Sequence, residues 1–206
     1  MLGWLNTPAL YLGDVATSRG EILGFLTGVL TVWLVVRRNI WNWPLGIANV
    51  LLLMLLFRNA GLYADAALQP VYVVLGLYGW WAWLAGGTGR SGLRVARTSR
   101  REWMALAAGG VLVTAAIWQY LDHATGSTVP LADAVTTGLS LVATYGQCRR
   151  LVESWWFWIA ADLIYIPLYL YKGLALTAVL YVVFLGLCVL GVRAWYAALR
   201  PSPVPA

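Results

Sequence analysis

The sequence predicts an all-α membrane protein with seven transmembrane helices. Of its 206 residues, 61% are hydrophobic, 11% are charged and 13 are tryptophan. A soluble domain of this length cannot bury so much apolar surface, since soluble domains contain about 25% charged residues. The basic residues lie in short gaps between apolar stretches, a pattern typical of orientation in a bilayer. The net charge of +6 therefore does not indicate nucleic-acid binding.

Seven apolar stretches are long enough to span a bilayer, which takes about 20 residues. The first residues include no Lys or Arg, and their apolar runs are broken at Pro8, Gly13 and Asp14. We therefore interpret residues 1–19 as a short interfacial segment and not as a signal peptide. The first two spans meet at residues 37–39, which predicts a tight helical hairpin. The stretches cover residues 20–38, 39–58, 62–86, 103–121, 130–148, 152–171 and 174–196.

The chain contains an internal repeat. A shift of 112 positions pairs residues 21–83 with 133–195 without a gap, and 16 of the 63 pairs are identical, where chance predicts roughly five. Corresponding helices are four spans apart along the chain, an even number of crossings, so both copies enter the membrane from the same side. This predicts parallel three-helix repeats in a 3+1+3, SWEET-like architecture. The predicted parts are the interfacial segment (1–19), a first three-helix repeat (20–86), a cytoplasmic loop and linker helix (87–129), a second repeat (130–196) and a cytoplasmic tail (197–206).

The distribution of Lys and Arg predicts the orientation. Eleven of these residues fall on one side of the predicted membrane and three on the other. Because positive charge marks the cytoplasmic side, the loop at residues 86–101 and the carboxyl end are expected in the cytoplasm and the amino end outside. The eleven are Arg37, Arg38, Arg90, Arg94, Arg97, Arg100, Arg101, Arg149, Arg150, Arg193 and Arg200; the three are Arg19, Arg58 and Lys172.

One face of the sixth span carries the strongest candidate site. Trp155, Trp158, Asp162, Tyr165 and Tyr169 follow one another at steps of three and four, so they share one face of a helix. An acid in the middle of a transmembrane helix is a functional candidate by default. The alternative is a structural acid satisfied by a neighbouring helix. The aromatic residues alone would indicate core packing or an interfacial belt.

Two polar residues of the first repeat complete the candidate site. Asn49 lies close to the predicted depth of Asp162, and the shift of 112 pairs it with Ala161. Buried polar groups in a bilayer need a partner or a ligand, so Asn49 either joins two helices or binds a substrate. Gln69 precedes Pro70, which leaves the carbonyl of residue 66 without its helical donor. A structural kink there remains an alternative to a binding role.

The sequence shows no arrangement typical of an enzyme or a metal protein. His123 is the only histidine, lies at a predicted outer loop and has no catalytic partner nearby. Cys148 and Cys188 are far apart within apolar stretches, so we interpret both as core residues. We therefore expect no catalytic residue, no metal site and no cofactor.

Three runs of sequence resemble the PnuC family of bacterial vitamin transporters, best known for nicotinamide riboside. They are WNWPLGIANVLL, GLYADAALQPVYVVLGLYGWWAW and RRLVESWWFWIAADLIYIPLYLYKGLALTAVLY, and the resemblance covers residues 21–196. It implies a carrier that moves the vitamin down its gradient while a cytoplasmic kinase traps it. The family's site positions fall on Asn49, Gln69, Trp155, Trp158 and Asp162. At Asp162 this chain departs from nicotinamide riboside carriers, which have Asn, and relatives carry thiamine or riboflavin.

The chemistry of Asp162 favours a cationic vitamin. Nicotinamide riboside and thiamine carry flat cationic rings that fit between Trp158 and Tyr165, with Asp162 as counter-charge. Riboflavin is neutral and gains less, and phosphorylated vitamins would meet no membrane-embedded Arg or Lys. We therefore expect uptake of nicotinamide riboside by facilitated diffusion, with thiamine or, less favoured, riboflavin as alternatives.

A structural membrane protein without transport activity is the alternative of a different class. The expected partners are a small vitamin and the lipid bilayer of a bacterial inner membrane, crossed several times. A homo-oligomer is compatible with the sequence.

Overall fold

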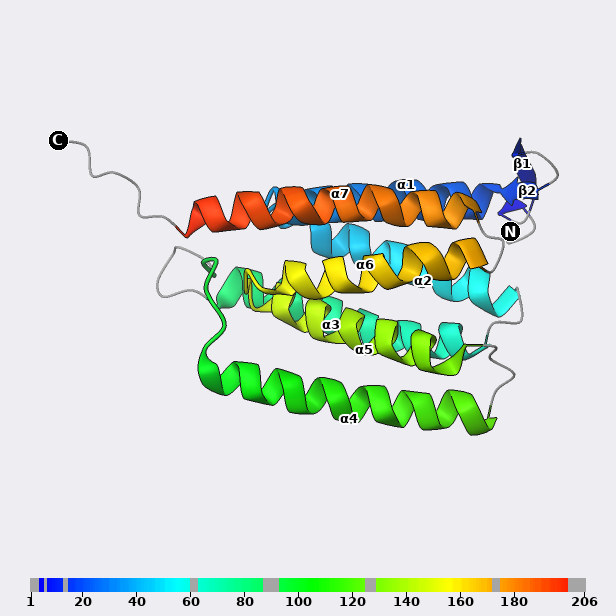
Figure 1. The fold of residues 1–206 in the computed structure, drawn as a ribbon. Helices are drawn as coiled ribbons and strands as arrows, with labels where there is room; N and C mark the ends of the chain where they lie inside the picture. Colours follow the sequence, from blue (N-terminus) through cyan, green and yellow to red (C-terminus); the bar gives the residue numbers. More distant parts are fainter. Residues whose placement is uncertain are drawn as a thin grey trace. The chain divides into compact units, whose positions relative to one another are not determined.

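The computed structural model describes residues 4–5, 7–12, 15–59, 63–86, 93–124, 129–171 and 175–199. These residues form seven α-helices and one short β-hairpin (Figure 1). In chain order the elements are β1 (Pro8–Leu12), β2 (Val15–Ser18), α1 (Arg19–Val36), α2 (Asn42–Asn59), α3 (Tyr63–Ala85), α4 (Arg100–Ala124), α5 (Pro130–Cys148), α6 (Ser154–Tyr171) and α7 (Ala175–Ala198).

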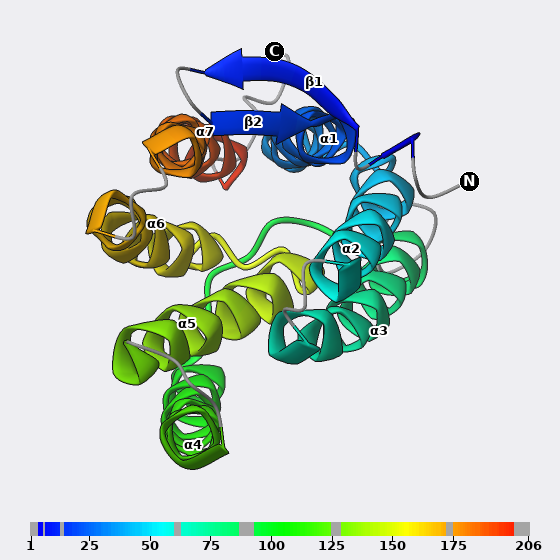
Figure 2. The same cartoon turned by 90° about the vertical axis from the view of Figure 1, so that its right-hand side faces the viewer.

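The helices belong to two compact units, Met1–Trp80 and Trp81–Ala206. The first unit contains the hairpin, α1, α2 and most of α3, and α1 packs against α2. The second unit contains the last turn of α3 and the helices α4 to α7. Within it each helix packs against the next one along the chain, α4 on α5, α5 on α6 and α6 on α7 (Figure 2).

The seven predicted spans are confirmed, and the helices begin and end within three residues of the predicted boundaries. By length and composition, Arg19–Val36, Arg100–Ala124 and Thr177–Ala198 are each long and apolar enough to cross a membrane. The hairpin of β1 and β2 was not predicted, and residues 13 and 14 between its strands lie outside the described residues.

The first helix of each repeat ends in the same type of turn. Arg38 and Arg150, which the 112-residue shift pairs, have positive φ angles of 55° and 50°. This left-handed conformation lets the next residue donate to a carbonyl five residues earlier, which closes the helix end. The tight hairpin predicted at residues 37–39 is confirmed, since α1 ends at Val36 and α2 begins at Asn42. The closing bonds run from Asn39 N to Leu34 O (2.9 Å) and from Leu151 N to Gly146 O (2.8 Å).

Both repeats also use the same contact between their second and third helices. A Cβ on Gly79 of α3 would lie 2.1 Å from the indole of Trp43 in α2. A Cβ on Gly191 of α7 would lie 2.5 Å from the indole of Trp155 in α6. The 112-residue shift pairs these residues, so each repeat places a tryptophan where only glycine leaves room. This agreement supports the predicted division into repeats.

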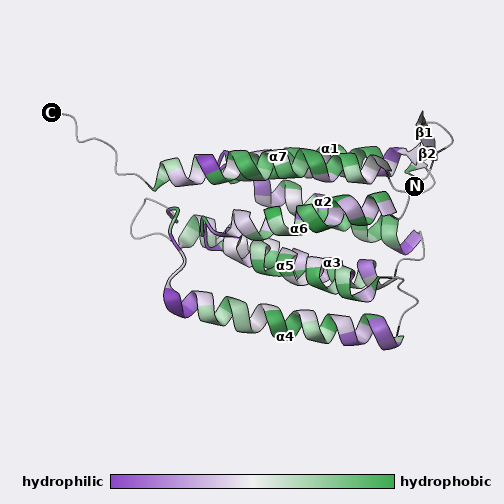
Figure 3. Ribbon diagram, viewed as in Figure 1, coloured by the Kyte–Doolittle hydropathy of each residue, from purple (hydrophilic) through white to green (hydrophobic). Residues whose placement is uncertain are grey.

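Helix α4 lies at the edge of the second unit. None of its residues is buried, its middle is apolar and both ends are hydrophilic (Figure 3). It contacts α5 where Gly138 faces Thr114, and Trp103 packs against Phe157 of α6 at 5.5 Å. The exposed apolar surface of α4 is suited to lipid, since a soluble helix would not leave it uncovered.

The segment before α4 is fastened to the turn between α5 and α6. Ala96 pairs with this turn through its backbone, accepting from Val152 N (3.0 Å) and donating to Arg150 O (3.1 Å). The carboxylate of Glu153 accepts from the backbone N and the hydroxyl of Thr98, at 2.9 and 2.8 Å. These bonds make residues 96–98 part of the second unit.

Candidate functional site

The predicted aromatic face of α6 packs against α7. At one end Trp155 is fully buried and meets Trp195 edge to face, with ring centroids 5.4 Å apart. In the middle Asp162 contacts Cys188. At the other end Tyr165 packs on Tyr181, with centroids 4.5 Å apart. The face predicted from helical spacing is therefore real, and α7 is the element that covers it.

Asp162 is the central polar group of this interface and is only 1% exposed. Its Oδ2 accepts a hydrogen bond from the thiol of Cys188, with sulfur and oxygen 3.5 Å apart. Among the described residues nothing donates to its Oδ1. The structural alternative considered for this acid is thus half fulfilled, because a neighbouring helix satisfies one oxygen and leaves the other open.

Three donors on the same helix are buried without an acceptor among the described residues. They are the indole Nε1 atoms of Trp155 and Trp158 and the hydroxyl of Ser154. A buried donor without a partner costs about 1–3 kcal/mol, so such groups usually have an acceptor in the working state of a protein. The two indoles precede Asp162 by seven and four residues, which places Trp155, Trp158 and Asp162 on one side of α6.

A cluster of tyrosines flanks Asp162 toward the carboxyl end of α6. Tyr165 stacks on Tyr169 at 5.5 Å, and Tyr181 of α7 packs on both rings. Tyr181 also meets Phe184 edge to face at 5.7 Å. Aromatic rings therefore lie next to Asp162 on the side opposite the two tryptophans.

Asn49 joins α2 to α1. Its side-chain nitrogen donates to the carbonyl of Gly24 at 2.8 Å and to the hydroxyl of Thr27 at 2.7 Å. These are the contacts expected of a polar residue that holds two membrane helices together. Its amide oxygen accepts no hydrogen bond from the described residues, so a binding role for that atom remains a prediction.

Gln69 lies in α3 and is 6% exposed. Its amide nitrogen donates to the carbonyl of Asp65, one turn earlier, at 3.2 Å. The sequence had suggested the carbonyl of Ala66, freed by Pro70, as its neighbour. The Gln69 amide instead contacts its own helix one residue before that carbonyl, and Pro70 lies within a continuous helix.

The structure thus gathers four predicted site residues, Trp155, Trp158, Asp162 and Tyr165, on α6 of the second unit. Asn49 and Gln69 lie in the first unit, and their participation in one site with the α6 residues stays a prediction.

Sequence reasoning missed Tyr181 and Cys188, the contributions of α7. Tyr181 had a signal, since the 112-residue shift pairs it with Gln69, a predicted site residue. Cys188 had none, because its partner at that shift is Gly76.

An apolar groove between α4 and α5 is separate from this face. It has a volume of about 380 Å³ and a lining that is apolar apart from Thr114 and Trp118, with Phe157 as its contribution from α6. It contains no predicted site residue and no charge that could orient a vitamin. The described residues also contain no group of three or more His, Cys, Asp or Glu that could hold a metal ion.

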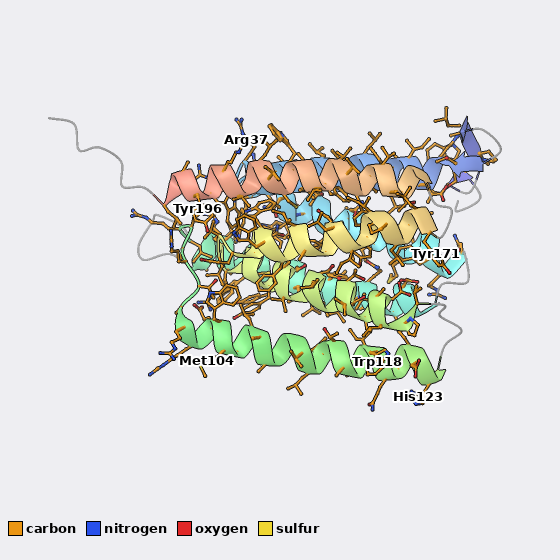
Figure 4. The ribbon with its side chains drawn as sticks, viewed as in Figure 1. Arg37, Met104, Trp118, His123, Tyr171 and Tyr196 are labelled. Carbon is orange, nitrogen blue, oxygen red and sulfur yellow. The ribbon has the colours of Figure 1, made fainter. Side chains whose placement is uncertain are left out.

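The two ends of the second unit differ in charge. Met104 and Tyr196 mark one end, and Trp118, His123 and Tyr171 mark the other (Figure 4). The first end has the start of α4, the turn between α5 and α6 and the end of α7, and every Lys or Arg described in this unit lies there. These residues are Arg94, Arg97, Arg100, Arg101, Arg149, Arg150 and Arg193.

Comparison with known proteins identifies the family. The family model described as nicotinamide mononucleotide transporter matches residues 18–197. The riboflavin/roseoflavin transporter RibM of Streptomyces davaonensis is 31% identical over 99% of this chain and 97% of its own length. The nicotinamide riboside transporter PnuC of Escherichia coli is 23% identical over 87% of this chain and 86% of its own.

A solved structure agrees with these relatives. The crystal structure of the vitamin B3 transporter PnuC superposes with a TM-score of 0.68 at 26% identity, covering 85% of this chain and 80% of that one. The resemblance noted from three sequence motifs is therefore confirmed, together with the all-α, multi-pass membrane fold. The family model and the relatives are all named as transporters, which supports a role in transport and not in catalysis. The chain belongs to the PnuC family of bacterial vitamin transporters.

Proposed function

We propose that this protein takes up an unphosphorylated vitamin with a flat ring system, and that riboflavin is its preferred substrate. The observation that carries the proposal is the polar pattern on α6. The open oxygen of Asp162 is an acceptor, and the buried N–H groups of Trp155 and Trp158 are donors without acceptors. The imide edge of a flavin offers partners of both kinds, an N–H for the carboxylate oxygen and carbonyl oxygens for indole N–H groups. The similarity to RibM over 99% of the chain supports the same substrate.

Nicotinamide riboside, the vitamin expected from the sequence, is the second candidate. The carboxylate of Asp162 supplies a counter-charge for its pyridinium ring, and Tyr165 and Tyr181 supply aromatic faces. Its carboxamide also pairs a donor with an acceptor. Thiamine fits by the same charge argument. The two candidates differ in what they require of Asp162, since a flavin needs a hydrogen-bond acceptor and a cation needs the negative charge.

Phosphorylated vitamins do not suit this face. The described residues that contact α6 and α7 around Asp162 include no Lys or Arg, and a phosphate next to a buried carboxylate would be repelled. We therefore propose transport of the free vitamin, although the family model takes its description from a mononucleotide.

Facilitated diffusion is the proposed mechanism. Asp162 is the only buried acid among the described residues, so they contain no relay of titratable groups for proton coupling. Pro167 lies within α6 and leaves the carbonyl of Leu163, the residue after Asp162, without its helical donor. A helix weakened there can bend to admit the vitamin. Phosphorylation by a cytoplasmic kinase then prevents its return.

A binding panel on the purified protein in detergent tests the proposal. Riboflavin, nicotinamide riboside, thiamine and flavin mononucleotide are titrated, with flavin fluorescence or calorimetry as readout. We expect riboflavin to bind at least about tenfold more tightly than the cationic vitamins, because its imide edge satisfies donors that cost about 1–3 kcal/mol when unpaired. Flavin mononucleotide should bind weakly. Tighter binding of nicotinamide riboside would reverse the substrate assignment, and no binding of any vitamin would favour a structural membrane protein.

A further inference from the structure

The one hydrogen-bond partner that the described residues give Asp162 comes from α7. The thiol of Cys188 donates to Oδ2, and Cys188 is 3% exposed. Both groups therefore lie inside the protein, where the thiol is not competing with water. Oδ2 is held on the side of α7, and Oδ1 is left with no donor among the described residues.

The contacts on either side fix Cys188 in this place. On α7, Tyr181, Cys188, Gly191 and Trp195 are separated by seven, three and four residues, so they share one face of the helix. This face meets Trp155 at Gly191 and Trp195, and it meets the tyrosines of α6 at Tyr181. Close packing at both ends sets the register of α7 against α6, so Cys188 cannot slide away from Asp162 without breaking one of them.

We propose that Cys188 is a positioning residue that holds the Asp162 carboxylate so that Oδ1 faces the vitamin. The inference rests on the proposed function and assigns a role in it to α7, which the sequence did not implicate. The terminal torsion of an Asp side chain has a broad energy minimum, so its carboxylate turns freely about the Cβ–Cγ bond unless one oxygen is fixed. The thiol fixes one oxygen and thereby sets the direction of the other.

A thiol suits this role better than the obvious alternatives. It is a weak donor, so it orients the carboxylate without neutralising its ability to accept from a substrate. An alanine in its place would supply no donor and would leave the carboxylate to rotate. A serine would keep a donor on a shorter arm, since the C–O bond is shorter than the C–S bond.

The variants that test the proposal are Cys188→Ala, Cys188→Ser and, as a matched control, Cys148→Ala. Cys148 is also a fully buried cysteine, but it ends α5 and is not assigned to the site. Binding of riboflavin and nicotinamide riboside is measured for each purified variant, with thermal unfolding as the control for folding. We expect Cys188→Ala to weaken both vitamins about fivefold, the size of one hydrogen bond's contribution. Cys188→Ser should recover most of that loss, and Cys148→Ala should bind as wild type does.

A cycle with Asp162→Asn separates a positioning role from a structural one. If Cys188 acts through the carboxylate, the loss caused by Cys188→Ala should shrink when Asp162→Asn is already present. A loss of the same size in both backgrounds, or wild-type binding by Cys188→Ala, overturns the proposal.

The infrared S–H stretching band of the ligand-free protein gives a readout that needs no vitamin. In a Cys148→Ala background only the Cys188 thiol contributes, and Asp162→Asn should shift its band toward that of a weaker hydrogen bond. An unshifted band overturns the inference even if vitamins bind. A shifted band with no vitamin binding to wild type instead overturns the proposed function, and with it the substrate role of Oδ1.

Discussion

The indole of Trp155 lies against the bare Cα of Gly191, so close that a Cβ on the glycine would fall 2.5 Å from the ring. Trp155 is fully buried, so its indole has no free space into which it could shift to make room for a larger residue at position 191. Because the same two residues set the register in which Asp162 meets Cys188, the stability of this contact and the geometry of the candidate site are linked.

Gly191→Ala should therefore destabilise the protein. Overpacking of this kind costs about 1–3 kcal/mol, since the indole and the helix backbone must shift to admit the methyl group. Thermal unfolding of the purified protein measures the effect. Gly186→Ala is the matched control on the same helix, because nothing lies within 4 Å of its added Cβ. Equal unfolding temperatures for the two variants would contradict the packing argument.

Asn49→Ala should also lower the unfolding temperature. The substitution removes the hydrogen bonds from Asn49 to Gly24 and Thr27 that join α2 to α1, and each such bond contributes about 0.5–1.5 kcal/mol. Thr27→Val should reproduce part of the loss, and the double variant should lose less than the sum. Vitamin binding by the same samples then tests the amide oxygen. Normal stability of Asn49→Ala would show that the bonds to α1 are dispensable.

Trp158→Ala should weaken vitamin binding by about 1–2 kcal/mol, through loss of the aromatic face and of its buried N–H. Trp158→Phe should lose less, because it keeps part of the ring. Trp156→Ala serves as control, since Trp156 belongs to the same helix but is 50% exposed. Titration of riboflavin and nicotinamide riboside gives the three affinities. If Trp158→Ala binds as tightly as wild type, Trp158 is not part of the site.

Asp162→Asn should separate the two candidate substrates. The amide keeps the shape of the side chain and one acceptor oxygen but removes the charge, so nicotinamide riboside should lose more affinity than riboflavin. Riboflavin keeps an acceptor for its imide N–H, but this single oxygen must then serve both the vitamin and Cys188. Both affinities are titrated on wild type and variant, with thermal stability as the folding control. Parallel losses for both vitamins together with a lower unfolding temperature would instead identify Asp162 as a structural group.

The orientation can be tested with Ala96→Cys. Ala96 is exposed at the end of the second unit that carries the described basic residues, and the positive-inside rule predicts that this end faces the cytoplasm. The introduced thiol should react with an impermeant reagent only after cells are opened. Wild type is the control, because Cys148 and Cys188 are both buried. Labelling of intact cells would reverse the proposed topology.

The helices and the face of α6 could be predicted because both depend on local periodicity. Twenty apolar residues predict a span, and steps of three and four place Trp155, Asp162 and Tyr165 together. What covers that face could not be predicted, since the register between two helices depends on contacts such as Trp155 with Gly191. Cys188 therefore looked like an ordinary core residue. Asn49 shows the same limit, because sequence alone did not distinguish a bond to α1 from a bond to substrate.

The turns and tryptophan contacts that both repeats share indicate how the substrate specificity of such a carrier can change during evolution. The 112-residue shift matches Trp43 and Gly79 with Trp155 and Gly191, yet it matches Val50 with Asp162 and Gly76 with Cys188. The two copies thus share the turns and the Trp–Gly contacts between helices but differ at the candidate site. Under the proposed function, a substitution at the site in one copy can change the substrate specificity, while the contacts that hold the helices of both copies together stay the same.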